Sequence, residues 1–152
     1  MRAVLQRVSS ASVAVDGALV ASIGHGLLVL AAVGRDDVDA DAAYIVDKTV
    51  NLRIFPDEAG RFDRSVTDVG GSVLVVSQFT LYGETRKGRR PSFTGAAAPA
   101  EAVERFEDLV RRFREAGVPA ETGRFQAMME VSLVNDGPVT IILDSADRHR
   151  PR

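Results

Sequence analysis

The chain has 152 residues, of which 45% are hydrophobic and 26% charged, a composition typical of one globular domain with a core of its own. It holds no cysteine and only two histidines, His25 and His149, which excludes disulfides, cysteine-based or histidine-rich metal sites and a cysteine nucleophile. The formal net charge of −2 gives no global attraction to nucleic acid or to an anionic membrane.

The first part of the chain predicts strands. Residues 1–23 alternate apolar with polar or small side chains, and Asp16-Gly17 separates two such runs in the manner of a hairpin turn. The continuous apolar run 27–33 predicts a strand buried on both faces, and it is far shorter than the roughly 20 residues of a membrane span. The first ten residues do not resemble a signal peptide, and the lack of cysteine suits a reducing compartment, so we expect a cytoplasmic protein.

A helix is predicted next, because apolar side chains recur at spacings of four and three between residues 38 and 52. Aspartates gather at its start, where they suit the positive end of the helix dipole. They could instead form a carboxylate site, but the solvated helix start is the favoured interpretation. These residues are Asp36, Asp37, Asp39 and Asp41, and the segment Gly34-Arg35-Asp36-Asp37 offers an N-cap. Residues 57–68 are predicted to be a loop.

The second half predicts a core strand over residues 72–78 and an amphipathic helix over residues 99–116. Between them, residues 83–99 have no periodicity, and a loop of that length in a compact domain is commonly functional. Two further strands are predicted, 128–134 and 139–143, followed by the polar tail 145–152, which is expected to be disordered.

This order of elements predicts a single α+β domain over residues 1–144, with a mainly antiparallel sheet and two helices on one face. An open sheet of this kind has unpaired edges, which dimerisation could hide. Within it, His25 lies between two glycines, and a turn residue is a better interpretation than a catalytic base.

One candidate site lies where the strand over residues 72–78 runs into the irregular loop. Ser77-Gln78-Phe79-Thr80 places hydroxyls, an amide and free backbone N–H groups at a strand end, where they could bind a carbonyl oxygen. The alternative is a strand end whose polar side chains satisfy the backbone.

A second candidate is Asn135-Asp136-Gly137-Pro138-Val139-Thr140. Its pattern favours a hairpin turn, whereas a cis Gly-Pro bond could present two neighbouring carbonyls to an ammonium group. The third candidate is the basic run Arg86-Lys87-Gly88-Arg89-Arg90, which is either solvated surface or a phosphate contact for one end of an RNA.

The two candidate segments together resemble the signature motifs of the D-aminoacyl-tRNA deacylases. Flanking segments resemble the same family in the same order, and the resemblance covers essentially Met1–Leu143. These segments are Val4–Val8, Gly26–Leu30, Gly70–Val76, Arg90–Phe93 and Thr122–Phe125.

The resemblance implies a sheet curled toward a barrel and a homodimer with active sites at the subunit interface. It implies an enzyme that needs no metal or organic cofactor. Its reaction would be hydrolysis of the ester of D-aminoacyl-tRNA, and of mischarged glycyl-tRNA, at the acceptor end. The terminal ribose hydroxyl would assist, and the variant mechanism has Thr80 as a covalent nucleophile.

The resemblance also assigns residues. Gly137 and Pro138 would hold the substrate amino group and reject L-residues, while Ser77, Gln78, Phe79 and Thr80 would line the ester. Arg7 would support the Gly-Pro element, Phe125 and Met129 would lie near the terminal adenosine, and Arg86, Lys87, Arg89 and Arg90 could contact phosphates. Two other hypotheses remain open: a non-catalytic tRNA-end binding dimer, and a structural domain whose Gly-Pro turn closes a hairpin.

Overall fold

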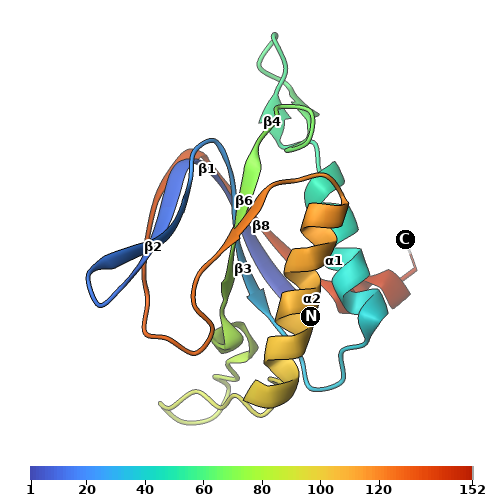
Figure 1. Cartoon of the computed structure of the whole chain (residues 1–152). Coiled ribbons are helices and arrows are strands. Elements are labelled where there is room, and N and C mark those ends of the chain that lie inside the picture. Colours follow the sequence, from blue (N-terminus) through green and yellow to red (C-terminus); the bar gives the residue numbers. More distant parts are fainter. Residues whose placement is uncertain (152) are drawn as a thin grey trace.

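The computed structural model describes residues 1–151 as a six-stranded mixed sheet, a two-stranded hairpin and two α-helices (Figure 1). The elements are β1 (Arg2–Val15), β2 (Ala18–Ile23), β3 (Gly26–Ala32), α1 (Asp39–Asn51), β4 (Phe55–Pro56), β5 (Phe62–Arg64), β6 (Ser72–Ser77), the 3-10 helix η1 (Phe79–Tyr82), α2 (Pro99–Glu115), β7 (Ala120–Thr122), β8 (Glu130–Asp144) and the 3-10 helix η2 (Ser145–His149).

The sheet is organised around β1, the long first strand. One side of β1 pairs antiparallel with β3 and then β2, and the other side pairs antiparallel with β8. The pairs β3–β6 and β6–β7 are parallel, because α1 and α2 lie in the crossovers that connect these strands. Since β2 also contacts β6 and β7, the sheet curls toward a closed barrel, and the predicted fold class is confirmed.

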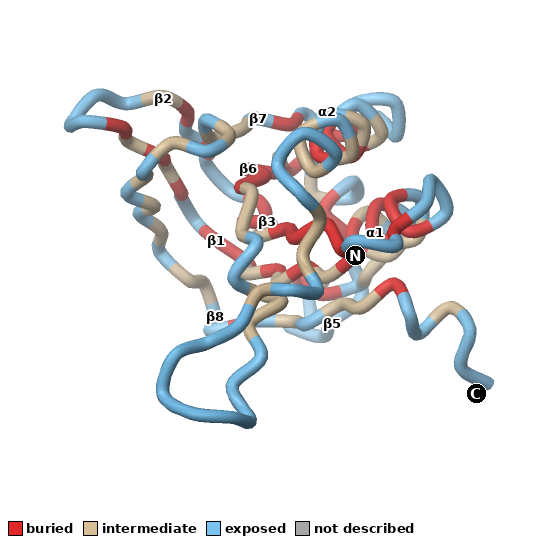
Figure 2. Tube along the Cα trace, turned by 90° about the horizontal axis from the view of Figure 1, so that it is seen from below, coloured by how far each residue is buried: buried red, intermediate tan, exposed pale blue. Residues whose placement is uncertain are grey.

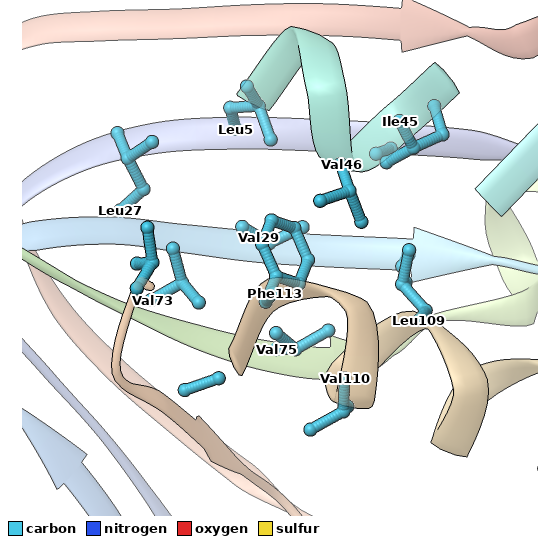
Figure 3. Packing of buried hydrophobic residues seen from close by; sticks show 14 of the residues in the cluster. Leu5, Leu27, Val29, Ile45, Val46, Val73, Val75, Leu109, Val110 and Phe113 are labelled. Atoms are coloured by element: carbon cyan, nitrogen blue, oxygen red, sulfur yellow. The ribbon is translucent and has the colours of Figure 1, made fainter. Parts of the chain in front are cut away.

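Two apolar clusters hold the sheet from both faces. On one face, the helices cover the strands, and Phe113 and Leu109 of α2 pack with Val29 and Val75 of the sheet (Figure 3). On the other face, the curled β1–β2 hairpin covers a smaller cluster that includes Leu74. Figure 2 shows the resulting belt of buried residues along β3 and β6. The strand predicted to be buried on both faces is β3.

Elements with a strong local pattern lie where the sequence predicts them. Asp16 and Gly17 form the hairpin turn between β1 and β2, with φ values of 51° and 78° that this turn requires. Helix α2 buries one stripe of side chains against the sheet, as its periodicity predicts. Neither helix among residues 1–151 has the length and hydrophobicity needed to span a bilayer.

The predicted cap of α1 is wrong. The N-cap is Val38, whose backbone N–H donates to the Asp41 carboxylate at 2.8 Å. Asp37 is buried instead, where it accepts hydrogen bonds from the Gly34 N–H and from the Met1 ammonium, each at 2.6 Å. These aspartates therefore satisfy backbone and terminal donors at the start of the helix.

Four other segments differ from expectation. Residues 57–68 include β5, which pairs with β4, and β7 is a strand that the sequence did not indicate. Residues 135–138 do not turn the chain, because β8 continues through them and stays paired with β1 on both sides, with shifts in register beside Val8. The tail that was expected to be disordered begins with η2, whose first residue, Ser145, is buried.

Candidate active site

The first motif lies at the end of β6. The N–H of Gln78 donates to the Ala31 carbonyl at 2.8 Å, which extends the parallel pairing one residue past Ser77. The chain then bends into η1, where the half-exposed Phe79 ring packs edge-on against Phe93 with 5.1 Å between centroids. A rigid strand therefore delivers this motif to an open surface.

Two backbone donors of this motif have no hydrogen-bond partner in the part of the chain that the structure describes. Among residues 1–151, the backbone N–H groups of Phe79 and Thr80 donate no hydrogen bond. The exposed Thr80 hydroxyl accepts from the Gln78 side-chain amide at 2.5 Å, and in the described part of the chain no carboxylate or imidazole hydrogen-bonds to it. Free N–H groups of this kind suit a carbonyl oxygen or an oxyanion, whereas a nucleophile normally needs an adjacent base.

The second motif is braced from beneath by Arg7, which is buried. The Arg7 Nε donates to the Asp136 carbonyl at 3.1 Å and lies 3.3 Å from the Asp136 carboxylate. Asn135 adds two bonds from its side-chain amide, to the Arg7 carbonyl at 2.9 Å and to the Val139 carbonyl at 3.1 Å. The exposed Gly137–Pro138 pair, joined by a cis peptide bond, is thus held on both sides.

Only glycine fits at position 137. Its φ of 127° lies in the region that favours glycine, and a Cβ there would lie 2.9 Å from Val139 Cγ2 and 3.1 Å from Arg7 Nη2. Arg7 can therefore approach position 137 closely only because glycine has no side chain.

The two motifs lie toward opposite ends of the paired strands β3 and β6. Arg7, beside the second motif, pairs with Leu27, whereas Ser77 pairs with Ala31 four residues further along β3. At about 3.3 Å per residue, this separates the motifs by roughly 13 Å along the strands. In Figure 1, β4, whose Phe55 ring lies 6.0 Å from the Arg7 guanidinium, is at the top of the view, and the segment after β6 is at the bottom. One chain alone does not bring them together.

Phe125 lies three residues after Thr122 of β7, which pairs with Val75 of β6. Met129 lies close to the same segment, because a Cβ on Gly123 would be 2.6 Å from its sulfur. Phe125 packs on Phe106 of α2, with 6.0 Å between ring centroids, and lines a cavity of about 360 Å³. Arg114 and Arg124 also line this cavity. Met129 packs against the smaller apolar cluster, so that it is partly buried. An aromatic wall with cationic neighbours suits a nucleotide base and its phosphate.

The basic run forms the exposed tip of the loop after η1. Arg86 is engaged, because it pairs with Glu84 at 2.7 Å and lowers the pKa of that carboxyl to about 2. Lys87, Arg89 and Arg90 are exposed, and none forms an ion pair with another of residues 1–151. Three free cations therefore project beside the first motif.

The sequence assigned no functional role to two aromatic residues near these motifs. Tyr82, in η1, packs under the Arg2 guanidinium at 4.6 Å, and its burial together with the Asp37 and Asp144 carboxylates raises its pKa. Phe62, in β5, lies over the Arg7 guanidinium at 5.6 Å. Neither belongs to a periodic pattern, and the contacts that place them connect residues far apart in the chain.

Comparison with known proteins gives matches over nearly the whole chain. The family model described as D-Tyr-tRNA(Tyr) deacylase matches residues 4–144. The D-aminoacyl-tRNA deacylase of Desulforudis audaxviator (strain MP104C) is 59% identical over 145 residues, which are 95% of this chain and 97% of that protein. That of Roseiflexus castenholzii (strain DSM 13941 / HLO8) is 55% identical over 152 residues, with coverage of 100% and 97%.

Solved structures agree with this fold. A structure described as c-Myc DNA Unwinding Element Binding Protein superposes with a TM-score of 0.89 at 39% identity, covering 95% of this chain and 98% of that one. A probable eukaryotic D-amino acid tRNA deacylase, at 20% identity, shares the fold with a TM-score of 0.77 over 93% of this chain and 97% of that one. The chain therefore belongs to the D-Tyr-tRNA(Tyr) deacylase family, and it is a hydrolase.

Proposed function

We propose that the protein hydrolyses the ester that joins a D-amino acid, or a mischarged glycine, to the terminal adenosine of tRNA. The observation that carries this proposal is the similarity, over the full length and through both motifs, to proteins named D-aminoacyl-tRNA deacylase. The free N–H groups of Phe79 and Thr80 support it, because they suit the carbonyl oxygen of an ester.

The active form that we propose is a homodimer with sites at the interface. The opposite placement of the motifs supports this, since a two-fold axis across the strands sets the Gly137 end of one copy against the Ser77 end of the other. An apolar face is available for such a contact: Ile142 of β8 is 78% exposed, and it lines a shallow cavity of about 340 Å³ with Val4 and Leu81.

Chirality follows from holding two substituents of the substrate. The Gly137 and Pro138 carbonyls accept hydrogen bonds from the substrate ammonium, and the Phe79 and Thr80 N–H groups hold the ester carbonyl. With both fixed, the side chain of an L-residue points into the protein and clashes, whereas that of a D-residue points to solvent. Glycine has no side chain to exclude, so the same site accepts it.

Hydrolysis in this proposal depends on positioning more than on an activated side chain. The Thr80 hydroxyl has no base beside it among the described residues, and an aminoacyl ester is already reactive. We therefore assign assistance to the substrate's own ribose hydroxyl, which the site holds close to the ester carbonyl. No metal or organic cofactor takes part in this scheme.

The rest of the tRNA end extends from the ester over neighbouring surfaces. The terminal adenosine lies near Phe125 and Met129, and the phosphates before it reach Lys87, Arg89 and Arg90. Arg86 is less available, because Glu84 holds it. We therefore expect the enzyme in the cytoplasm, where it would meet its tRNA substrate.

The experiment that tests this proposal follows release of the amino acid from D-Tyr-tRNA, L-Tyr-tRNA and glycyl-tRNA in separate reactions with EDTA. Hydrolysis of the D- and glycyl-esters alone is expected. Hydrolysis of all three contradicts the chiral clamp, and loss of activity with EDTA contradicts the metal-free scheme. If no ester is cleaved while tRNA still binds in a salt-dependent manner, the tRNA-end binding dimer replaces the proposal.

A further inference from the structure

The β4–β5 hairpin takes no part in the scheme above, yet it contacts the residue that braces the clamp. We infer that Phe62 is a positioning residue, whose ring holds the Arg7 guanidinium against the Gly137 segment and so sets where the Gly137 and Pro138 carbonyls lie. The inference rests on the proposed function, because it assigns Phe62 to the substrate clamp of that site.

Arg7 is contacted both by the second motif and by this hairpin together with the residue before it. The guanidinium carbon lies 5.6 Å from the centroid of the Phe62 ring and 6.0 Å from that of Phe55. Nη1 donates to the Ile54 carbonyl at 2.8 Å, while Nε donates to Asp136 in the second motif. A cation within about 6 Å of an aromatic face is attracted to it. The hairpin therefore holds one side of the guanidinium while the clamp segment takes the other.

The position of Phe62 is not explained by the hydrophobic core. Its side chain is 57% exposed and it belongs to neither apolar cluster, whereas Phe55 is fully buried among core residues. Every residue of β5 is exposed. A half-exposed ring gains little free energy from burial. We therefore take the contact with Arg7 as the interaction that explains the position of the Phe62 ring. Phe62 can also be replaced without opening a cavity in the core.

The hairpin fixes Phe62 through contacts that do not involve its ring. Phe62 pairs with Pro56, and the Asp57 N–H donates to the Arg61 carbonyl at 2.8 Å. The Asp57 carboxylate closes the turn, since it accepts from the N–H groups of Ala59 at 2.8 Å and Arg61 at 2.9 Å. A substitution at Phe62 is therefore expected to leave the hairpin in place.

The test compares Phe62→Ala, Phe62→Leu and Phe62→Tyr, with Leu19→Ala as a matched control. Leu19 is also an exposed apolar residue of a hairpin strand, 68% exposed and in β2. We expect the Ala and Leu variants to lose about tenfold in kcat on D-Tyr-tRNA, which corresponds to ~1.4 kcal/mol, with KM unchanged. Phe62→Tyr retains a ring face and is expected to match the wild type, as is Leu19→Ala.

The Leu variant separates the ring face from simple packing. If Phe62→Leu turns over like the wild type, an apolar side chain is sufficient and the inference is overturned. It is also overturned if the loss of kcat is accompanied by a change in oligomeric state, measured by light scattering, because Phe62 would then serve association.

A second readout keeps the inference separate from the proposed function. If the wild type cleaves no aminoacyl-tRNA, the proposed function fails, and the Arg7 side chain is then followed by NMR. The Nε–H resonance of Arg7 is expected to shift and to exchange faster with water in Phe62→Leu but not in Leu19→Ala. An unchanged Arg7 resonance in Phe62→Leu overturns the inference whatever the activity.

Discussion

Replacement of Gly137 by alanine tests the clamp most directly. At a φ of 127°, the new side chain imposes backbone strain of about 1–3 kcal/mol. Its Cβ would also lie 2.9 Å from Val139 Cγ2, 3.0 Å from the Val139 nitrogen and 3.1 Å from Arg7 Nη2, and overpacking of this kind costs roughly another 1–3 kcal/mol. The Val139 nitrogen is backbone and cannot rotate away, so the carbonyls of the segment must move.

A shift of this kind acts on the chemistry through geometry. A displacement of about 1 Å in a positioning group can cost around 100-fold in rate. We therefore expect Gly137→Ala to lower the rate of D-Tyr-tRNA hydrolysis by about 100-fold, to reduce discrimination against L-Tyr-tRNA, and to lower the free energy of unfolding by a few kcal/mol.

Gly17→Ala is the matched control, because Gly17 also has a positive φ, 78°, but a Cβ there meets nothing within 4 Å. It carries the backbone strain without the clash and lies in the β1–β2 turn. Steady-state hydrolysis of both esters and denaturant unfolding of both variants are the measurements. Wild-type rate and selectivity in Gly137→Ala would refute the clamp, as would an equal loss of activity in Gly17→Ala.

Three further predictions concern other parts of the site. Thr80→Ala should keep near-normal turnover of D-Tyr-tRNA, since no base activates the hydroxyl. A loss of about 1,000-fold or more, the scale expected when a nucleophile is removed, would restore the covalent mechanism. Arg89→Ala should weaken tRNA binding and reduce the slope of log K against log salt by about 0.7, the value for one single-strand phosphate contact, and an unchanged slope would remove Arg89 from the interface. Because Arg86 lowers the pKa of Glu84 to about 2, the contact between them contributes fully above the unfolded-state pKa of about 4.3 and is lost as the pH falls toward 2. NMR titration of the Glu84 carboxyl measures this, and a midpoint near 4.3 would contradict the pairing.

Local patterns predicted the elements that depend on local chemistry. The Asp16-Gly17 turn and helix α2 are confirmed because turn conformation and amphipathic periodicity are properties of neighbouring residues. The strand β3 was predictable from its apolar run, since burial on both faces needs no alternation. The first motif was placed at a strand end for the same reason.

The remaining features depend on contacts between distant segments. The sequence around Gly137 has the composition of a turn, but β1 supplies a partner strand on both sides of it, so β8 continues. No local pattern indicates a role for Phe62, because the role that we infer for it depends on its contact with Arg7, 55 positions earlier in the sequence. Asp37 was predicted as part of a helix cap because it directly precedes the apolar periodicity of α1. Its actual partner, the Met1 ammonium, is distant in the sequence and does not contribute to that local pattern.

The separation of the two motifs along the sheet has a genetic consequence. If each site combines the Gly137 end of one copy with the Ser77 end of another, a copy damaged in one motif and a copy damaged in the other can compensate for each other. Mixed assemblies of the two would contain one intact site and one that carries both defects. Two alleles whose products are each inactive alone would then complement each other when expressed together, whereas two alleles damaged at the same end would not.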